Sequence, residues 1–211
     1  WTFNIATKTW SELQLNTAVS PNPLPELAEP GIHWSASQSA LYIYGGFLPS
    51  ELPNNTIYKV TFNEGAGTYT WTTVTAVNAN PSADLPSNVL ARYKIVSDPA
   101  RDRFFLLGGL RYVYTDTNNN GIYDNGENVT SAVLNDDIFM YDVAQNRWAK
   151  IAQTGTGYAS RYDFGATIDG SGQRLYVYGG RGATCTDSFQ RAPSCTRKDR
   201  LQIGQFANFT G

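Results

Sequence analysis

Three apolar segments, each ending in a pair of glycines, divide this chain into similar units. They are LYIYGG ending at Gly46, FFLLGG ending at Gly109 and LYVYGG ending at Gly180. An earlier apolar segment and a tight turn precede each one, which predicts strand pairs over residues 32–36 and 40–44, 93–96 and 103–107, and 162–168 and 174–178. Because the same order recurs, the sequence predicts a repeat architecture.

An aromatic strand followed by a tryptophan recurs in the same order as the glycine pairs. The segments run from Phe3 to Trp10, from Tyr58 to Trp71 and from Tyr141 to Trp148. They add two strands to each unit, and their large rings are suited to packing one sheet on the next. Each four-stranded sheet would be one blade, and several such sheets arranged around a centre form a propeller.

This order resembles the kelch repeat over nearly the whole chain. The features that match are an Arg-Tyr opening at Arg92-Tyr93 and Arg161-Tyr162, the apolar run with its glycine pair, an aromatic residue on the third strand and a tryptophan on the fourth. The first unit departs from the pattern, since it opens with Gly31-Ile32-His33-Trp34. The resemblance implies an all-β, kelch-type β-propeller.

The repeat predicts about three four-stranded blades and part of a preceding one, all within one propeller domain. We expect the end of a preceding blade at residues 1–13 and blades at 30–75, 88–152 and 160–211. The second blade would carry an insertion at 110–135, and the third a cysteine loop at 181–198. Propellers usually have four to eight blades, so we expect this to be a segment of a larger closed propeller or a chain that joins another.

The composition is typical of a secreted all-β module. Lys plus Arg is 16 and Asp plus Glu is 18, so the net charge is −2 and no basic stripe indicates nucleic acid as a partner. Charged residues make up 16%, below the average of about 25%. No run approaches the roughly 18 apolar residues of a membrane helix, so we expect no membrane span in this segment.

The segment from Asp116 to Glu127 has the spacing of an EF-hand calcium loop. Oxygen-bearing side chains stand at positions one, three, five, nine and twelve, with Gly121 at the bend and a backbone carbonyl available at position seven. The predicted ligands are Asp116, Asn118, Asn120, Ile122, Asp124 and Glu127. Because Ca²⁺ prefers six to eight oxygen ligands and the loop needs a sharp turn at its sixth residue, the sequence predicts Ca²⁺ as a cofactor.

This loop is expected to order the insertion rather than to act as a switch. Residues 111–114 and 129–134 on either side favour β or coil, so the sequence does not predict the two helices that flank the loop in an EF-hand. Two neutral asparagine ligands favour a modest affinity, roughly 10⁻⁴ to 10⁻³ M. The alternative is a solvated acidic turn that binds no ion.

Other features also indicate an extracellular protein. Asn54, Asn128 and Asn208 begin N-x-S/T sequons and are candidate glycosylation sites, the alternative being unmodified polar loops. Cys185 and Cys195 are predicted to form a disulfide within one loop, whereas a cytosolic protein would keep both as thiols.

The long connections are predicted to lie on one face of the propeller. They include residues 47–55, 110–135 and 181–198 and the proline-rich links 15–30 and 76–88. Because binding residues concentrate on loops held by a rigid scaffold, we expect this face to contact a protein or glycan partner, or to mediate self-assembly. The alternative is that insertions accumulate there because they do no harm.

Arg92 and Arg161 are candidate ligand-binding residues, because the two Arg-Tyr pairs place them at equivalent positions. They could hold an acidic ligand or satisfy carbonyl and carboxylate groups between blades.

No catalytic residues are predicted, and we expect a binding or assembly module for adhesion, matrix or filaments. Some kelch-like propellers belong to copper oxidases resembling galactose oxidase, which use two histidines, two tyrosines and a cysteine. A fragment of such a carbohydrate-active oxidase is the alternative. His33 is the single histidine, and its place beside Trp34 favours packing or a hydrogen bond over metal binding.

Overall fold

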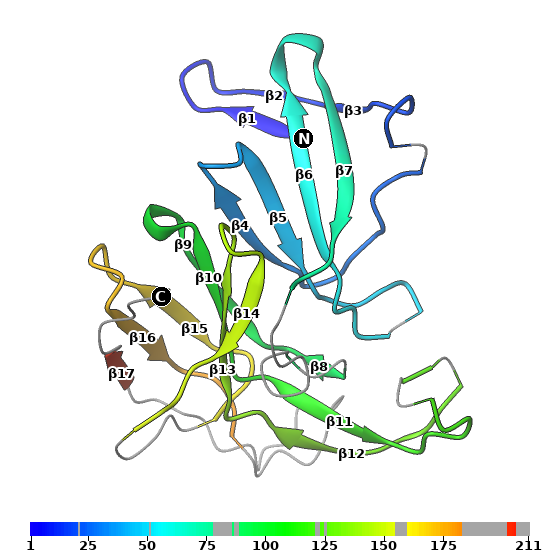
Figure 1. Ribbon diagram of the computed structural model, residues 1–211, viewed down its shortest axis with the longest axis vertical. Coiled ribbons are helices and arrows are strands. Elements are labelled where there is room, and N and C mark those ends of the chain that lie inside the picture. Colours follow the sequence, from blue (N-terminus) through cyan, green and yellow to red (C-terminus); the bar gives the residue numbers. More distant parts are fainter. Residues whose placement is uncertain are drawn as a thin grey trace.

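The computed structural model describes residues 1–20, 22–50, 52–77, 86, 89–120, 123–124, 126–154, 160–182 and 202–205. In this part the chain is mostly strands and turns, with two 3₁₀ turns (η1, Glu64–Ala66; η2, Pro99–Arg101) and no α-helix. None of its helical turns has the length and apolar character needed to span a membrane. The described strands form five sheets (Figure 1), which confirms the predicted all-β fold class.

The first blade is a five-stranded sheet in the order β3-β7-β6-β5-β4. Its antiparallel strands are β4 (Gly31–Ser35), β5 (Ala40–Tyr44), β6 (Ile57–Asn63) and β7 (Thr68–Val74). The fifth strand, β3 (Gln14–Leu15), pairs parallel to the outer edge of β7. The sequence predicted only a link from residue 15 onward, because a two-residue strand has no measurable periodicity.

The second and third blades repeat this antiparallel order. The second contains β9 (Lys94–Asp98), β10 (Arg103–Leu107), β13 (Ile138–Asp142) and β14 (Arg147–Lys150). The described part of the third contains β15 (Gly165–Ile168), β16 (Arg174–Tyr178) and β17 (Gln202–Gln205). The predicted second strands at 40–44, 103–107 and 174–178 coincide with β5, β10 and β16.

The amino-terminal hairpin has the register of the outer half of the second blade. β1 (Thr2–Asn4) pairs with β2 (Thr9–Ser11) so that Phe3 lies opposite Trp10, just as Tyr141 lies opposite Trp148. The ring centroids are 4.9 Å apart in the first pair and 5.2 Å in the second. Phe3 and Trp10 are exposed, whereas Tyr141 and Trp148 are buried. The hairpin therefore has the form of the two outer strands of a blade.

The insertion in the second blade forms a sheet of its own. β11 (Leu110–Tyr114) and β12 (Val129–Leu134) make an antiparallel hairpin, and β8 (Leu90–Ala91) pairs with the base of β11. In Figure 1 this hairpin projects sideways below the blades. The segment with calcium-loop spacing lies at its tip.

The three blades radiate from a common centre. Their innermost strands are β4, β9 and β15, and β9 contacts both of the others. Figure 1 shows the sheets splaying apart from these strands toward their outer edges. The described chain is therefore a partial, propeller-like segment.

The second glycine of each pair allows the backbone to turn against the beginning of the blade. Gly46 and Gly109 have φ values of +83° and +91°, which residues with a Cβ rarely adopt. A Cβ on Gly46 would lie 2.5 Å from the Ala28 carbonyl oxygen, and one on Gly109 would lie 2.5 Å from that of Ala91. A side chain would therefore collide with backbone at either position.

The core lies between blades, and β10 contributes to both of its halves. Phe104 and Leu106 pack with residues of the first blade such as Tyr44, whereas Phe105 and Leu107 pack toward the third blade. Because successive strand residues face opposite sides, an unbroken apolar strand can fill two interfaces at once. This explains why FFLL contains no polar residue.

We predict that Phe104→Ala lowers the free energy of unfolding by about 3–5 kcal/mol, because it opens a cavity among buried aromatic rings. Phe104 is 1% exposed, and its ring lies 5.4 Å from Trp148 and 5.0 Å from Tyr141. Denaturant titration measures the loss. The matched variant Phe3→Ala changes a ring that is 45% exposed, so it should lower the free energy of unfolding by about 1 kcal/mol or less. Equal losses in the two variants would contradict this description of the core.

Candidate functional site

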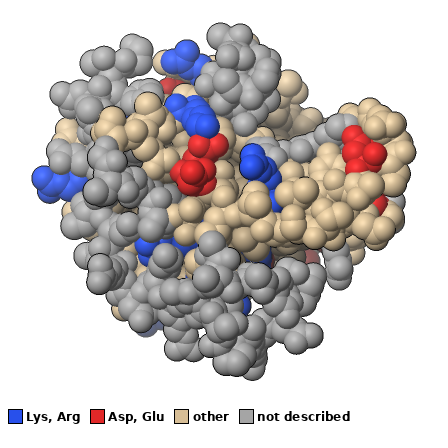
Figure 2. Space-filling view, turned by 90° about the horizontal axis from the view of Figure 1, so that it is seen from below, with Lys and Arg blue, Asp and Glu red and all other residues tan. Residues whose placement is uncertain are grey.

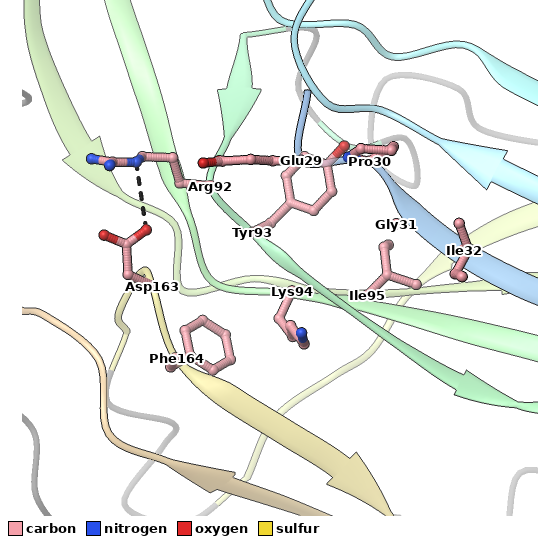
Figure 3. A pocket seen from close by; sticks show the side chains of 10 residues that line it. All are labelled: Glu29, Pro30, Gly31, Ile32, Arg92, Tyr93, Lys94, Ile95, Asp163 and Phe164. Carbon is pink, nitrogen blue, oxygen red and sulfur yellow. Dashed lines mark ion pairs between the residues drawn. The ribbon is translucent and has the colours of Figure 1, made fainter. Parts of the chain in front are cut away.

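A cleft of about 350 Å³ lies where the first strands of the three blades begin. Figure 3 shows side chains from all three blades around it. Its charged lining residues are Glu29, Arg92, Lys94 and Asp163, and its other lining residues are Pro30, Gly31, Ile32, Tyr93, Ile95 and Phe164. First strands begin where second strands end, since Gly31 pairs with Tyr44 and Lys94 with Leu107. The cleft is therefore at the end of the blades that carries the long connections.

Glu29, Arg92 and Asp163 occupy corresponding positions in the three blades. Their φ values are 56°, 55° and 53°, in the left-handed region that is uncommon for residues other than glycine. The residue before each one bridges to the residue after a glycine pair: Ala28 to Phe47, Ala91 to Leu110 and Tyr162 to Arg181. The fold thus imposes one backbone conformation and leaves three different side chains at the cleft.

This correspondence corrects the predicted equivalence of Arg92 and Arg161. Both precede a tyrosine in the sequence, but in the structure Arg92 corresponds to Asp163, two residues beyond Arg161. The Arg161 side chain is 1% exposed, and its Nη1 donates to the Gly179 carbonyl oxygen at 2.8 Å. Arg161 is therefore a buried structural residue, and only Arg92 lines the cleft.

The charges of the cleft are partly paired with one another. Arg92 Nε lies 3.5 Å from Asp163 Oδ1, and Arg181 Nε lies 3.8 Å from Asp163 Oδ2. Glu29 and Lys94 are exposed and form no ion pair with any other described residue. Their carboxylate and ammonium groups are therefore the charges of the cleft most accessible to a ligand.

Tyr93 provides an uncharged aromatic wall. Burial raises the pKa of its hydroxyl group, so the phenol is neutral at physiological pH. The hydroxyl oxygen accepts a hydrogen bond of 3.1 Å from the Gly46 N–H. The phenol thereby links the second blade to the glycine pair of the first.

The tip of the β11–β12 hairpin brings several of the predicted calcium ligands together. The Asn120 N–H lies 3.2 Å from Asp116 Oδ1 and 3.1 Å from Asn118 Oδ1. The side-chain amides of Asn118 and Asn120 both donate to Asp124 Oδ2, at 2.8 and 2.7 Å. Four of the six predicted ligands thus lie within one hydrogen-bonded group.

Glu127 closes the tip through both carboxylate oxygens. Oε1 accepts from the Thr117 N–H at 2.8 Å, and Oε2 accepts from the Asp124 N–H at 3.0 Å. The remaining predicted ligand, Ile122, lies outside the described residues. Within the described chain no three His, Cys, Asp or Glu side chains gather closely enough to hold a metal, so any ion here would also need the asparagine oxygens.

Hydrogen bonding perturbs one carboxylate of this tip. The pKa of Asp124 is lowered because the amides of Asn118 and Asn120 donate to its ionised form. The carboxylate is therefore charged at neutral pH, as a cation ligand must be.

The three predicted glycosylation sites have different surroundings. Asn54 is buried, its Nδ2 donates to the Gly45 carbonyl oxygen at 3.1 Å, and its Oδ1 accepts from Tyr58. Because this side chain is buried, the folded structure disfavours a glycan at Asn54. Asn128 is exposed beside the hairpin tip. Asn208 lies outside the described residues, as do Cys185 and Cys195.

The sequence favoured packing or a hydrogen bond for His33, and the structure shows a polar network whose partners were not predicted. His33 Nδ1 lies 2.8 Å from Ser97 Oγ, and Nε2 lies 3.2 Å from Asp102 Oδ1. The hydroxyl groups of Ser35 and Ser37 also donate to Asp102. Both ring nitrogens are thus occupied by hydrogen bonds that join the first blade to the second.

We predict that this network makes stability depend on pH. Burial lowers the pKa of His33 below 6.5, and the nearby Asp102, which raises this pKa, does not fully compensate. The unfolded chain therefore binds a proton more readily, so stability is complete above pH 6.5 and is lost as the pH falls below it, by up to about 1.4 kcal/mol per pH unit.

Denaturant titrations between pH 7.5 and 5.0 measure this loss before most carboxylates titrate. The variant His33→Gln should have a flatter profile over the same range, whatever its absolute stability. An unchanged slope in the variant would show that His33 is not the titrating group.

Comparison with known proteins supports the fold and no finer identity. No protein-family model matches the chain, and no curated protein matches it. Among solved structures, one titled "Structure of YjhT" is similar with a TM-score of 0.54 and 13% sequence identity, over 96% of this chain and 51% of that chain. At this identity the similarity shows a propeller-type fold alone, and this chain spans about half the length of the protein it matches.

Proposed function

We propose that this chain is an extracellular, calcium-binding propeller module of the kelch type that binds a protein or glycan partner. The observation that carries the proposal is the convergence of three blades on one cleft, where the corresponding side chains Glu29, Arg92 and Asp163 differ. A ligand there would contact rigid strand ends rather than a single loop. This is the arrangement in which binding residues are commonly found on repeat scaffolds.

The kelch assignment is supported by how the repeated residues pack. The glycine pairs approach backbone at the beginning of each blade, and Trp148 lies in the core between blades. These are the positions that the resemblance to the kelch repeat implies for those residues.

The cleft is suited to a polar ligand with at least one anionic group. Lys94 has no ion-pair partner among the described residues and can contact an anionic group, whereas Asp163 is already paired with Arg92 and Arg181. The neighbouring Tyr93 and Phe164 supply apolar surface. An acidic peptide or an acidic glycan would satisfy both features.

Binding of a fluorescently labelled Asp/Glu-rich peptide, followed by anisotropy, tests the cleft. We predict that Lys94→Ala weakens binding at least about fivefold, as expected for loss of a charge-assisted contact of about 1 kcal/mol. Lys59→Ala is the matched control, because Lys59 lies on β6, does not line the cleft and donates a hydrogen bond to the Gln38 side chain. If the unmodified protein binds neither this peptide nor an acidic glycan, the cleft has no such function.

Calcium is proposed because the hairpin tip fits it in chemistry. The donors are carboxylate and amide oxygens, which Ca²⁺ prefers, and Asp116, Asn118 and Asp124 already lie within one hydrogen-bonded group. The amide nitrogens of Asn118 and Asn120 lie beside Asp124, and rotation of each amide by 180° would present its oxygen there instead. The bound ion would neutralise the carboxylates and stiffen the hairpin.

Calorimetric titration with CaCl₂ should give a dissociation constant of about 10⁻⁴ to 10⁻³ M. We predict that Asp116→Ala weakens this binding at least about tenfold, because it removes a charged oxygen ligand. Asp136→Ala, an acidic residue outside the loop, should leave it unchanged. Equal titration curves for all three proteins would remove the calcium site from the proposal.

A further inference from the structure

The β12 strand is an open edge. It ends the sheet order β12-β11-β8, and no other described strand pairs with its outer side. Alternate N–H and C=O groups of an edge strand point away from its one neighbour. Residues 129–133 are all exposed, so the outer edge of β12 offers these groups to a partner.

This edge has little of the usual protection against pairing. Soluble proteins shield edge strands with lysine, proline, bulges or short length. β12 is six residues long and reads VTSAVL, with no charge and no proline. Its one irregularity is a bulge at Thr130, near the tip, where the register passes from the Val113–Ser131 pair to the Tyr114–Val129 pair. The edge from Ser131 to Leu134 is therefore competent to accept a further strand.

Exposed valines beside the edge would add apolar contact. Val113 is 42% exposed and Val133 is 40% exposed. Because Val113 lies opposite Ser131 and Arg111 opposite Val133, the two valines share one face of the hairpin. Side chains of an added strand on that face would cover them.

The charges around β12 determine which strand fits. From Tyr112 to Asn146 the sequence contains six acidic residues and no Lys or Arg. Asp116, Asp124 and Glu127 lie beyond one end of β12, and Asp136 and Asp137 lie beyond the other. Asp137 is paired with Lys150 at 2.7 Å, so the exposed Asp136 supplies the negative charge at that end. The lobe at the right of Figure 2 carries acidic side chains and no basic ones on the face shown.

A second copy of this chain is a poor occupant of the edge. Antiparallel pairing of two β12 strands would bring the acidic tip of one hairpin against the acidic base of the other, and parallel pairing would align like ends. Like charges that face each other across paired strands are destabilising.

We propose that the edge of β12 binds, by strand addition, an extended segment of a protein partner with an uncharged, β-branched centre and basic residues at both ends. Backbone hydrogen bonds would supply affinity, and the acidic ends would select the partner by charge. This surface is separate from the cleft, and its partner has the opposite charge from the ligand proposed there.

The probe is a synthetic acetylated and amidated peptide, Lys-Arg-Thr-Val-Thr-Val-Thr-Lys-Arg, titrated into ¹⁵N-labelled protein at low salt. We expect chemical-shift changes concentrated on the amides of residues 129–134. The same peptide with Glu in place of its four basic residues should bind at least tenfold more weakly. A version with proline at its centre should lose binding, because it can neither donate nor lie flat in the sheet.

Val133→Lys should weaken binding of the basic peptide at least tenfold, since it places a positive charge on the edge. Val19→Lys, at a valine that is 63% exposed and outside the hairpin, is the matched control and should bind as the unmodified protein does. Lys94→Ala should also bind normally, which separates this test from that of the cleft.

The proposal would be overturned by no binding of the basic peptide, by equal binding of the proline peptide, or by shift changes away from β12. A dimer that Val133→Lys abolishes would assign the edge to a second copy and would equally overturn the stated occupant.

Discussion

The close approach of backbone at the centre of the blades is the constraint on which the rest of the structure depends. Gly46 and Gly109 pass so near the carbonyl groups of Ala28 and Ala91 that no Cβ fits. Gly31 of β4 packs against the Ile95 side chain of β9, where a further side chain would overlap that residue. This last contact joins the first strands of two blades, and the cleft lies where those strands begin.

The hydrophobic core follows from the same geometry. The second blade buries both faces against its neighbours, so β10 is apolar at every position from Phe104 to Leu107. The polar network of His33, Ser97 and Asp102 lies between the first and second blades as well. The interfaces between blades therefore combine aromatic packing with buried hydrogen bonds that fix the relative position of the sheets.

The two proposed binding surfaces lie on different parts of the fold, one on the blades and one on the inserted hairpin. The cleft is built from equivalent positions of successive blades, whose backbone is constant and whose side chains vary. The β12 edge belongs to an insertion that leaves the blade and forms its own sheet, so its edge is not covered by the described parts of neighbouring blades. A repeat scaffold can thus carry one site at its centre and another on an added arm.

The sequence by itself determined the all-β fold class and the recurring antiparallel strands, because glycine pairs, apolar alternation and aromatic positions are local signals that recur. It also indicated the tip of the insertion through the spacing of oxygen-bearing residues, although calcium remains a prediction. Only the tertiary structure decided that Arg92 corresponds to Asp163 rather than to Arg161, that Asn54 is buried and that the insertion is a hairpin with an open edge. His33 meets Asp102 across 69 residues of chain, and such contacts depend on how blades stack, which no local pattern encodes.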